Sequence, residues 1–130
     1  EDWFFRMAEE IWLILERNRQ TGREDVVEKA IAYLQSNYGD PNISAQYLAD
    51  KYHITPSYFS RLFHEKCGCH FPDYLVALRI ERARELLLER ENLSIQEICE
   101  LVGYSNASYF TTSFKKKYGM TPGQFRRSQH

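Results

Sequence analysis

Apolar residues recur at intervals of three and four along most of this chain, the spacing that places side chains on one face of an α-helix. In residues 2–19, for example, Phe4, Ala8, Ile11 and Leu15 fall on one stripe. The pattern predicts an all-α protein with helices over residues 2–19, 24–38, 44–52, 56–67, 72–91, 94–101 and 106–118, and a short last helix that begins at Thr121-Pro122.

Residues with capping chemistry stand at the expected helix ends. Ser44 and Ser94 precede apolar runs, where a side-chain oxygen accepts a free backbone N–H, and Pro56 suits a first turn. Gly68 and Gly119 follow two of the runs, where glycine commonly ends a helix. The residues expected to face the core of the first half are Val27, Ala30, Ile31, Leu34, Leu48, Ala49, Tyr58, Phe59, Leu62 and Phe63.

The second half of the chain repeats one pattern. Ser44 and Gln46 match Ser94 and Gln96 at an offset of 50. Identities at an offset of 51 join Ser57, Tyr58, Phe59, Phe63, Lys66 and Gly68 to Ser108, Tyr109, Phe110, Phe114, Lys117 and Gly119. The slip of one residue falls at a turn, where insertions are tolerated. The duplication predicts two tandem subdomains, residues 23–71 and 92–130, joined by a helix over 72–91, after an N-terminal helix or linker over 1–22.

Composition narrows the class of protein. With 43% hydrophobic and 27% charged residues, the 130-residue chain can bury a core. No apolar run approaches a membrane span and no signal peptide is visible. Three cysteines, an odd number, fit a reducing compartment. We therefore expect a cytoplasmic protein without membrane contact, and the first residue, Glu1, suggests a fragment of a longer protein.

The net charge of −1 is unevenly distributed. Residues 1–40 contain five Lys/Arg and nine Asp/Glu, whereas residues 41–130 contain twelve and nine. The repeated half is mildly basic, and DNA binding requires a basic face rather than a basic average.

Each repeat has the organisation of a helix-turn-helix, in which the first helix braces and the second enters the major groove. The turn requires tight backbone geometry, which Gly103 supplies in the second unit and His53 must adopt in the first. The second helix, 56–67 or 106–118, keeps aromatic side chains inside and polar ones outside. The expected DNA-contacting residues are Ser44, Pro56, Ser57, Ser60, Arg61, His64, Ser94, Asn106, Ala107, Ser108, Thr111, Thr112, Lys115 and Lys116.

Side-chain chemistry assigns roles within this set. Arg61 suits guanine and Asn106 suits adenine, while serines and threonines accept several partners. The lysines at 115–117 and the helix starts at Ser44 and Ser94 suit phosphates. The alternatives are an ion pair from Arg61 to Glu65 and a solvated face for the lysines.

The helix over 72–91 sets the distance between the two recognition helices. Twenty helical residues span about 30 Å, and adjacent major-groove segments lie about 34 Å apart. One polypeptide can therefore place two recognition helices in successive major-groove segments. We expect its apolar residues to face inward and its charged residues to lie on the other side; the latter are Arg79, Glu81, Arg82, Arg84 and Glu85.

Residues from about 24 to 128 resemble the DNA-binding domain of AraC-type (AraC/XylS) transcription regulators. The motifs that carry the resemblance are Tyr58-Phe59-Ser60-Arg61-Leu62-Phe63 with Gly68, Tyr74-Leu75 with Arg79-Ile80, Ala83 and Leu86-Leu87, and Ile95, Ile98, Gly103-Tyr104, Ser108-Tyr109-Phe110, Phe114-Lys115-Lys116, Gly119, Thr121-Pro122 and Phe125-Arg126. The resemblance implies homeodomain-like subdomains in tandem, sequence-specific binding to double-stranded promoter DNA and recruitment of RNA polymerase. It also implies a sensor, receiver or ligand-binding domain in the full-length protein.

Two positions depart from the family pattern. Thr112 stands where many members carry a basic residue, which shifts base reading towards Arg61. Cys99 replaces a usual alanine and is expected to be a buried small residue.

Other functions have weaker support in the sequence. His64, Cys67, Cys69 and His70 lie close together, but their spacing is not that of a zinc site, so we expect no metal and no cofactor. Without a phosphate-binding glycine loop, a nucleophile elbow or a His-Glu metal helix, we expect no enzyme. A helical protein-interaction module of the same fold remains the alternative. The helix over 2–19 could form a homodimer, pack on its own domain or contact a missing domain.

Overall fold

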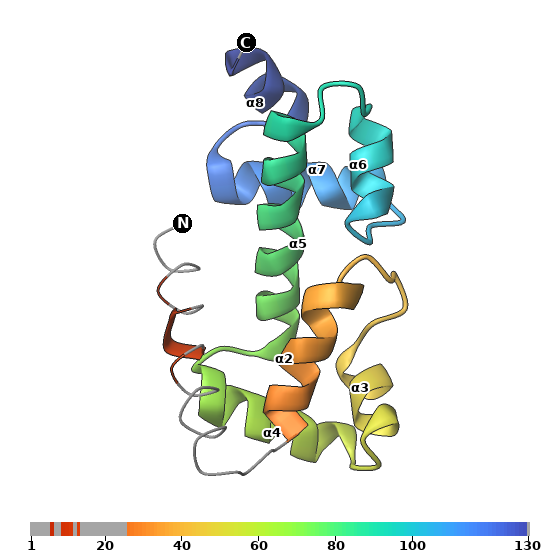
Figure 1. The fold of residues 1–130 in the computed structure, drawn as a ribbon, viewed down its shortest axis with the longest axis vertical. Coiled ribbons are helices and arrows are strands. Elements are labelled where there is room, and N and C mark those ends of the chain that lie inside the picture. Colours follow the sequence, from red (N-terminus) through yellow and green to blue (C-terminus); the bar gives the residue numbers. More distant parts are fainter. Residues whose placement is uncertain (1–5, 7–8, 12, 14–25, 130) are drawn as a thin grey trace. The chain divides into compact units, whose positions relative to one another are not determined.

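The computed structural model describes residues 6, 9–11, 13 and 26–129. Within these residues every regular element is a helix, which confirms the all-α prediction. The helices are α2 (Val26–Asn37), α3 (Ala45–Lys51), α4 (Pro56–Cys67), α5 (Phe71–Glu89), α6 (Ile95–Leu101), α7 (Ala107–Tyr118) and α8 (Pro122–Ser128) (Figure 1). Most of the predicted helix 2–19 lies outside the described residues.

The chain divides into two compact units. Unit 1 comprises Glu1–Asn37 and Asn42–Tyr74, and unit 2 comprises Tyr38–Pro41 and Leu75–His130. Each unit contains one of the repeated helix pairs, α3–α4 or α6–α7, and the long helix α5 belongs to both.

Unit 1 is built around an aromatic cluster. Phe59 and Phe63 of α4 are fully buried, and each ring lies 5.4 Å from that of Phe71 in an edge-on arrangement. The predicted inward residues of α2 and α3 are all buried: Val27, Ala30, Ile31, Leu34, Leu48 and Ala49. The helical spacing in the sequence therefore identified the packing faces of both helices.

Unit 2 repeats this arrangement, with α6 and α7 beside the C-terminal part of α5 (Figure 1). Its core contains Ile80, Ala83, Leu87, Ile98, Cys99, Val102, Tyr104, Phe110 and Phe114. Cys99 is fully buried as expected, and its Sγ lies 3.5 Å from the Tyr104 carbonyl oxygen.

The prediction for the charged residues of α5 is wrong at two positions. Arg79 is 9% exposed and Glu81 only 3%. Arg79 is buried because its guanidinium donates to the carbonyl oxygens of Tyr38 and Asp40, at 2.9 and 2.8 Å. Glu81 is buried because two donors from its surroundings satisfy its carboxylate. Apart from Arg84, which lies on α5 itself, these partners come from other segments, so periodicity could not reveal them.

Both helix-turn-helix turns have the tight backbone that the sequence requires. His53 has φ 62° and Gly103 has φ 101°, both in the left-handed region. Gly103 also admits close neighbours: a Cβ there would lie 2.9 Å from the Arg79 guanidinium and from the Tyr38 carbonyl oxygen.

Candidate nucleic-acid interface

Helices α4 and α7 begin and end in the same way. The Thr55 hydroxyl accepts the Tyr58 N–H, and the Asn106 side chain accepts the Tyr109 N–H. Left-handed Gly68 and Gly119 end the two helices. The repeated caps give both recognition helices the same length and the same register relative to their cores.

The predicted contact residues of α4 lie on its solvent side. Ser57, Ser60, Arg61 and His64 are exposed, and Pro56 is half-buried. Ser57, Arg61 and His64 recur at spacings of four and three residues, and with Ser60 they form one continuous polar stripe opposite the buried phenylalanines.

Tyr58 was expected in the core, but it is 43% exposed. Its neighbours Phe59 and Phe63 fill the core together with Phe71. The Tyr58 ring instead supports Arg61, whose guanidinium carbon lies 5.2 Å from the ring centroid. Among the described residues no ion pair joins Arg61 to Glu65.

The stripe on α7 has different chemistry. The exposed residues are Asn106, Ala107, Ser108, Thr112, Lys115 and Lys116, and Thr111 is half-buried. At the offset of 51, Thr112 occupies the position of Arg61, and Lys115 that of His64. Tyr109, which the prediction omitted, is 56% exposed and lies 5.6 Å from the Tyr104 ring.

Lys117 does not share the environment of the two lysines before it. Its ammonium group is buried and lies 5.7 Å from the Tyr118 ring centroid. Its charge also helps to lower the pKa of Glu81. The expectation that Lys117 lies on the phosphate-binding face is therefore wrong, because the buried carboxylate draws it inward.

Helix capping occupies three of the predicted contact residues, Ser44, Ser94 and Asn106. Ser44 and Ser94 accept the N–H groups of Tyr47 and Glu97, each at 3.0 Å. At Ser94 the Glu97 carboxylate also accepts the Ser94 N–H at 2.8 Å, which completes a capping box. That carboxylate places a negative charge where a phosphate would bind, whereas α3 has no acidic residue in its first turn. Asn106 uses its carbonyl oxygen as a cap, which leaves its NH₂ group for a base.

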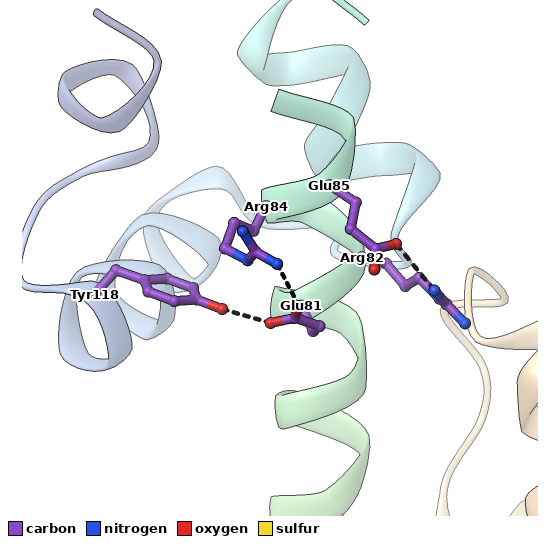
Figure 2. Close-up of polar contacts among 5 residues, drawn as sticks. All are labelled: Glu81, Arg82, Arg84, Glu85 and Tyr118. Atoms are coloured by element: carbon purple, nitrogen blue, oxygen red, sulfur yellow. Dashed lines mark hydrogen bonds and ion pairs between the residues drawn. The ribbon is translucent and has the colours of Figure 1, made fainter. Parts of the chain in front are cut away.

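A buried polar network supports the last turn of α7 (Figure 2). The Glu81 carboxylate accepts from the Tyr118 hydroxyl at 2.6 Å and from Arg84 Nη2 at 2.7 Å. Burial alone would raise the pKa of Glu81, but the hydrogen bonds from Arg84 and Tyr118 and the charges of Arg84 and Lys117 outweigh it and lower that pKa. The anionic carboxylate on α5 thus fixes the end of the second recognition helix.

The His–Cys segment does not gather as a metal site. His64 and His70 stack with centroids 4.4 Å apart, while Cys67 is buried. Among the described residues, no group of three or more His, Cys, Asp or Glu side chains is placed to hold a metal ion. A search of the same residues finds no helix long and apolar enough to span a membrane.

Comparison with known proteins places the chain in a family. Residues 48–128 match a family model described as a helix-turn-helix domain. The chain belongs to the AraC-type helix-turn-helix family. It is 36% identical over 106 residues to the transcriptional regulatory protein YesN of Bacillus subtilis, a match that covers 80% of this chain and 29% of YesN. It therefore spans less than a third of the length of that AraC-type relative.

Solved AraC-type structures agree with the fold. The C-terminal domain of AraT, a response regulator from Geobacillus stearothermophilus, is 37% identical with a TM-score of 0.77, over 81% of this chain and 86% of that one. The DNA-binding domain of AdpA, a global transcriptional factor in complex with a target DNA, is 20% identical with a TM-score of 0.74, over 81% and 93% of the two chains. The second likeness shows a shared fold.

Proposed function

We propose that α4 and α7 are the two recognition helices with which this AraC-type, DNA-binding transcription regulator reads a promoter. The observation that carries the proposal is the polar stripe that each helix presents opposite its buried phenylalanines, in the same register in both repeats. A related fold, that of AdpA, was solved with its target DNA.

The polar stripes of α4 and α7 favour different kinds of DNA contact. Arg61, supported by Tyr58, offers a planar donor for guanine. In α7, Thr112 and Ser108 offer short hydroxyl groups, and Lys115 and Lys116 offer charges for phosphates. Helix α4 therefore reads bases, and helix α7 contributes chiefly contacts to the phosphate backbone of the DNA.

The proposal extends to partners and location. YesN is much longer than this chain, and the AraT fragment is the C-terminal domain of a response regulator, which supports a separate sensor, receiver or ligand-binding domain. We infer recruitment of RNA polymerase and a cytoplasmic location, where bacterial promoters lie. We also infer no enzymatic activity for this chain, whose sequence contains no phosphate-binding glycine loop, nucleophile elbow or His-Glu metal helix.

Selection from random duplex DNA at near-physiological salt, followed by sequencing, tests the proposal. We expect an asymmetric site with two short boxes about one helical turn apart. The double variant Arg61→Ala/Lys115→Ala should lose the enrichment. A matched control, Lys29→Ala/Arg127→Ala, removes the same charge from exposed positions of α2 and α8 and should retain it.

The alternative is a helical protein-interaction module that has lost DNA binding, and the family membership does not favour it. It would be supported if the folded wild-type chain enriched no sequence and if the double variant bound every partner as the wild type does. If a single box were enriched and Arg61→Ala abolished that enrichment, only helix α4 would read the sequence.

A further inference from the structure

Helix α6 carries an open hollow on its outer surface. The hollow has a volume of about 350 Å³ and is lined by Leu93, Glu97, Glu100 and Leu101. Leu101 is 53% exposed. A single exposed leucine needs no explanation, but here it shares a concave surface with a second leucine and two carboxylates.

The internal repeat shows how unit 1 fills the corresponding place. At the offset of 50, the four lining residues correspond to Ile43, Tyr47, Asp50 and Lys51 around α3. Tyr33 of α2 covers this surface: its hydroxyl hydrogen-bonds to that of Tyr47 at 3.0 Å, and Lys51 Nζ lies 4.6 Å from its ring centroid. Ile43 is buried. Unit 1 thus combines an apolar residue, an aromatic ring and a cation.

Unit 2 retains only part of this combination. Glu97 stands in place of Tyr47, and Leu101 in place of Lys51. Leu93 is only half-buried, whereas Ile43 is buried. Positions 97 and 101 therefore lack the aromatic ring of Tyr47 and the cation of Lys51, and Glu97, Glu100 and Leu101 are exposed instead.

Hydrogen bonds hold both carboxylates in place. Glu97 accepts the Ser94 backbone N–H, and this hydrogen bond, with that of the Ser94 hydroxyl, lowers the pKa of Glu97. Glu100 accepts from Gln96 Nε2 at 3.0 Å. Neither carboxylate forms an ion pair with another described residue. Their negative charge repels phosphate, so this surface is not a continuation of the DNA interface.

We propose that the hollow on α6 binds a basic, apolar segment of a partner protein. An aromatic or aliphatic side chain enters between Leu93 and Leu101, and an adjacent Lys or Arg pairs with Glu97 and Glu100. The partner thereby covers α6 as Tyr33 covers α3 in unit 1, and it supplies a cation where Lys51 supplies one. An open surface of this kind suits protein side chains better than a small molecule, which requires enclosure.

Titration of the isotope-labelled full chain with a short peptide of alternating tyrosine, leucine and lysine, followed by NMR, tests this proposal. We expect the amide signals of residues 93–101 to shift. The variants Glu100→Lys and Leu101→Ser change exposed residues and should weaken binding at least about tenfold. The matched variant Asp50→Lys, at the equivalent position of α3, should bind as the wild type does. A peptide with glutamate in place of lysine should not bind.

Several results would overturn the proposal. Peptide binding that neither Glu100→Lys nor Leu101→Ser weakens would place the contact elsewhere. Without peptide, a shift of signals from residues 1–25 in Leu101→Ser would show that the chain's own N-terminal part occupies the hollow, and concentration-dependent shifts would show a second copy. DNA binding by Leu101→Ser, which keeps the net charge, should be unchanged, so this test is independent of the proposed promoter binding; a loss would assign the hollow to the DNA interface.

Discussion

At the scale of single residues, the two recognition helices differ most at one position. Arg61 in α4 corresponds to Thr112 in α7, although the tyrosines before them, Tyr58 and Tyr109, are both exposed. Tyr58 supports a guanidinium, whereas Tyr109 packs on Tyr104. The same fold therefore presents a guanidinium held against a tyrosine ring in α4 and a short hydroxyl group at the matching position of α7.

Replacing Arg61 by alanine should cost about 1–3 kcal/mol of DNA-binding free energy and relax the preference at one base pair, because a bidentate contact is lost. Tyr58→Ala should reduce the same preference to a smaller extent. Competition assays with single-base variants of the selected site measure both effects. Glu65→Ala is the control; if it reproduced the loss, an ion pair rather than the tyrosine would be orienting Arg61.

Replacing Lys115 by alanine should weaken binding to all sequences alike and reduce the salt-dependence slope of log K by about one, because one phosphate contact is lost. Lys117→Ala is a matched control two residues away. Since its ammonium group is buried against Tyr118, the slope should stay unchanged while the protein loses stability. Binding isotherms at several salt concentrations distinguish the two variants, and equal slopes for both would contradict the assignment.

At the scale of elements, the buried carboxylate on α5 makes the stability of unit 2 depend on pH. The folded-state pKa of Glu81 lies below its ordinary value, about 4.3. Its contribution to stability is therefore fully present above that pH and is lost as the pH falls through the lower, folded-state pKa.

Glu81→Gln should accordingly destabilise the protein at neutral pH, and the difference from the wild type should shrink below about pH 4. Urea unfolding followed by circular dichroism at several pH values measures it. The control is Glu85→Gln, whose pair with Arg82 has side chains 37% and 34% exposed and should contribute little. Identical pH profiles for the two variants would remove Glu81 from this role.

The two turns offer a matched test of backbone strain. His53 adopts a left-handed backbone that glycine favours, so His53→Gly should stabilise the protein by up to about 1 kcal/mol. Gly103→Ala should destabilise it by more than about 2 kcal/mol, because the added Cβ meets Arg79 and the Tyr38 carbonyl oxygen in addition to the unfavourable φ. Thermal unfolding measures both changes. A neutral Gly103→Ala would show that Arg79 moves aside at little cost.

These elements also show what the sequence can and cannot predict. Caps and spacing located α2 to α8 and the inward faces of α2 and α3, because those features are local. Arg79 and Glu81 were assigned to solvent because Tyr38, Asp40 and Tyr118, which hydrogen-bond to them, lie on other segments. Lys117 was assigned to solvent because the Glu81 carboxylate with which its charge interacts lies on α5. Tyr58 was assigned to the core because helical spacing alone does not tell an aromatic at the edge of the apolar face from one inside it.

At the scale of the whole molecule, the low net charge is compatible with DNA binding because unlike charges are separated. Arg61 of α4 and Lys115 and Lys116 of α7 are exposed cations, whereas Glu97 and Glu100 lie in the hollow of α6, and residues 1–40 contain nine Asp/Glu against five Lys/Arg. A chain of net charge −1 can therefore bind DNA with one surface and a basic partner with another.

The N-terminal segment offers a test of whether the chain is a monomer or a dimer. Of its described residues, Ile11 is 5% exposed within a single chain and Leu13 is 64% exposed. Burial of Ile11 in one copy favours packing on its own unit, so Ile11→Lys should lower the melting temperature, whereas Leu13→Lys should alter neither stability nor mass. Light scattering of the full chain and both variants at matched concentrations checks this. If the wild type has the mass of two chains and Leu13→Lys has the mass of one, the homodimer through residues 2–19 would be established. Paired promoter sites would then be the expected DNA target.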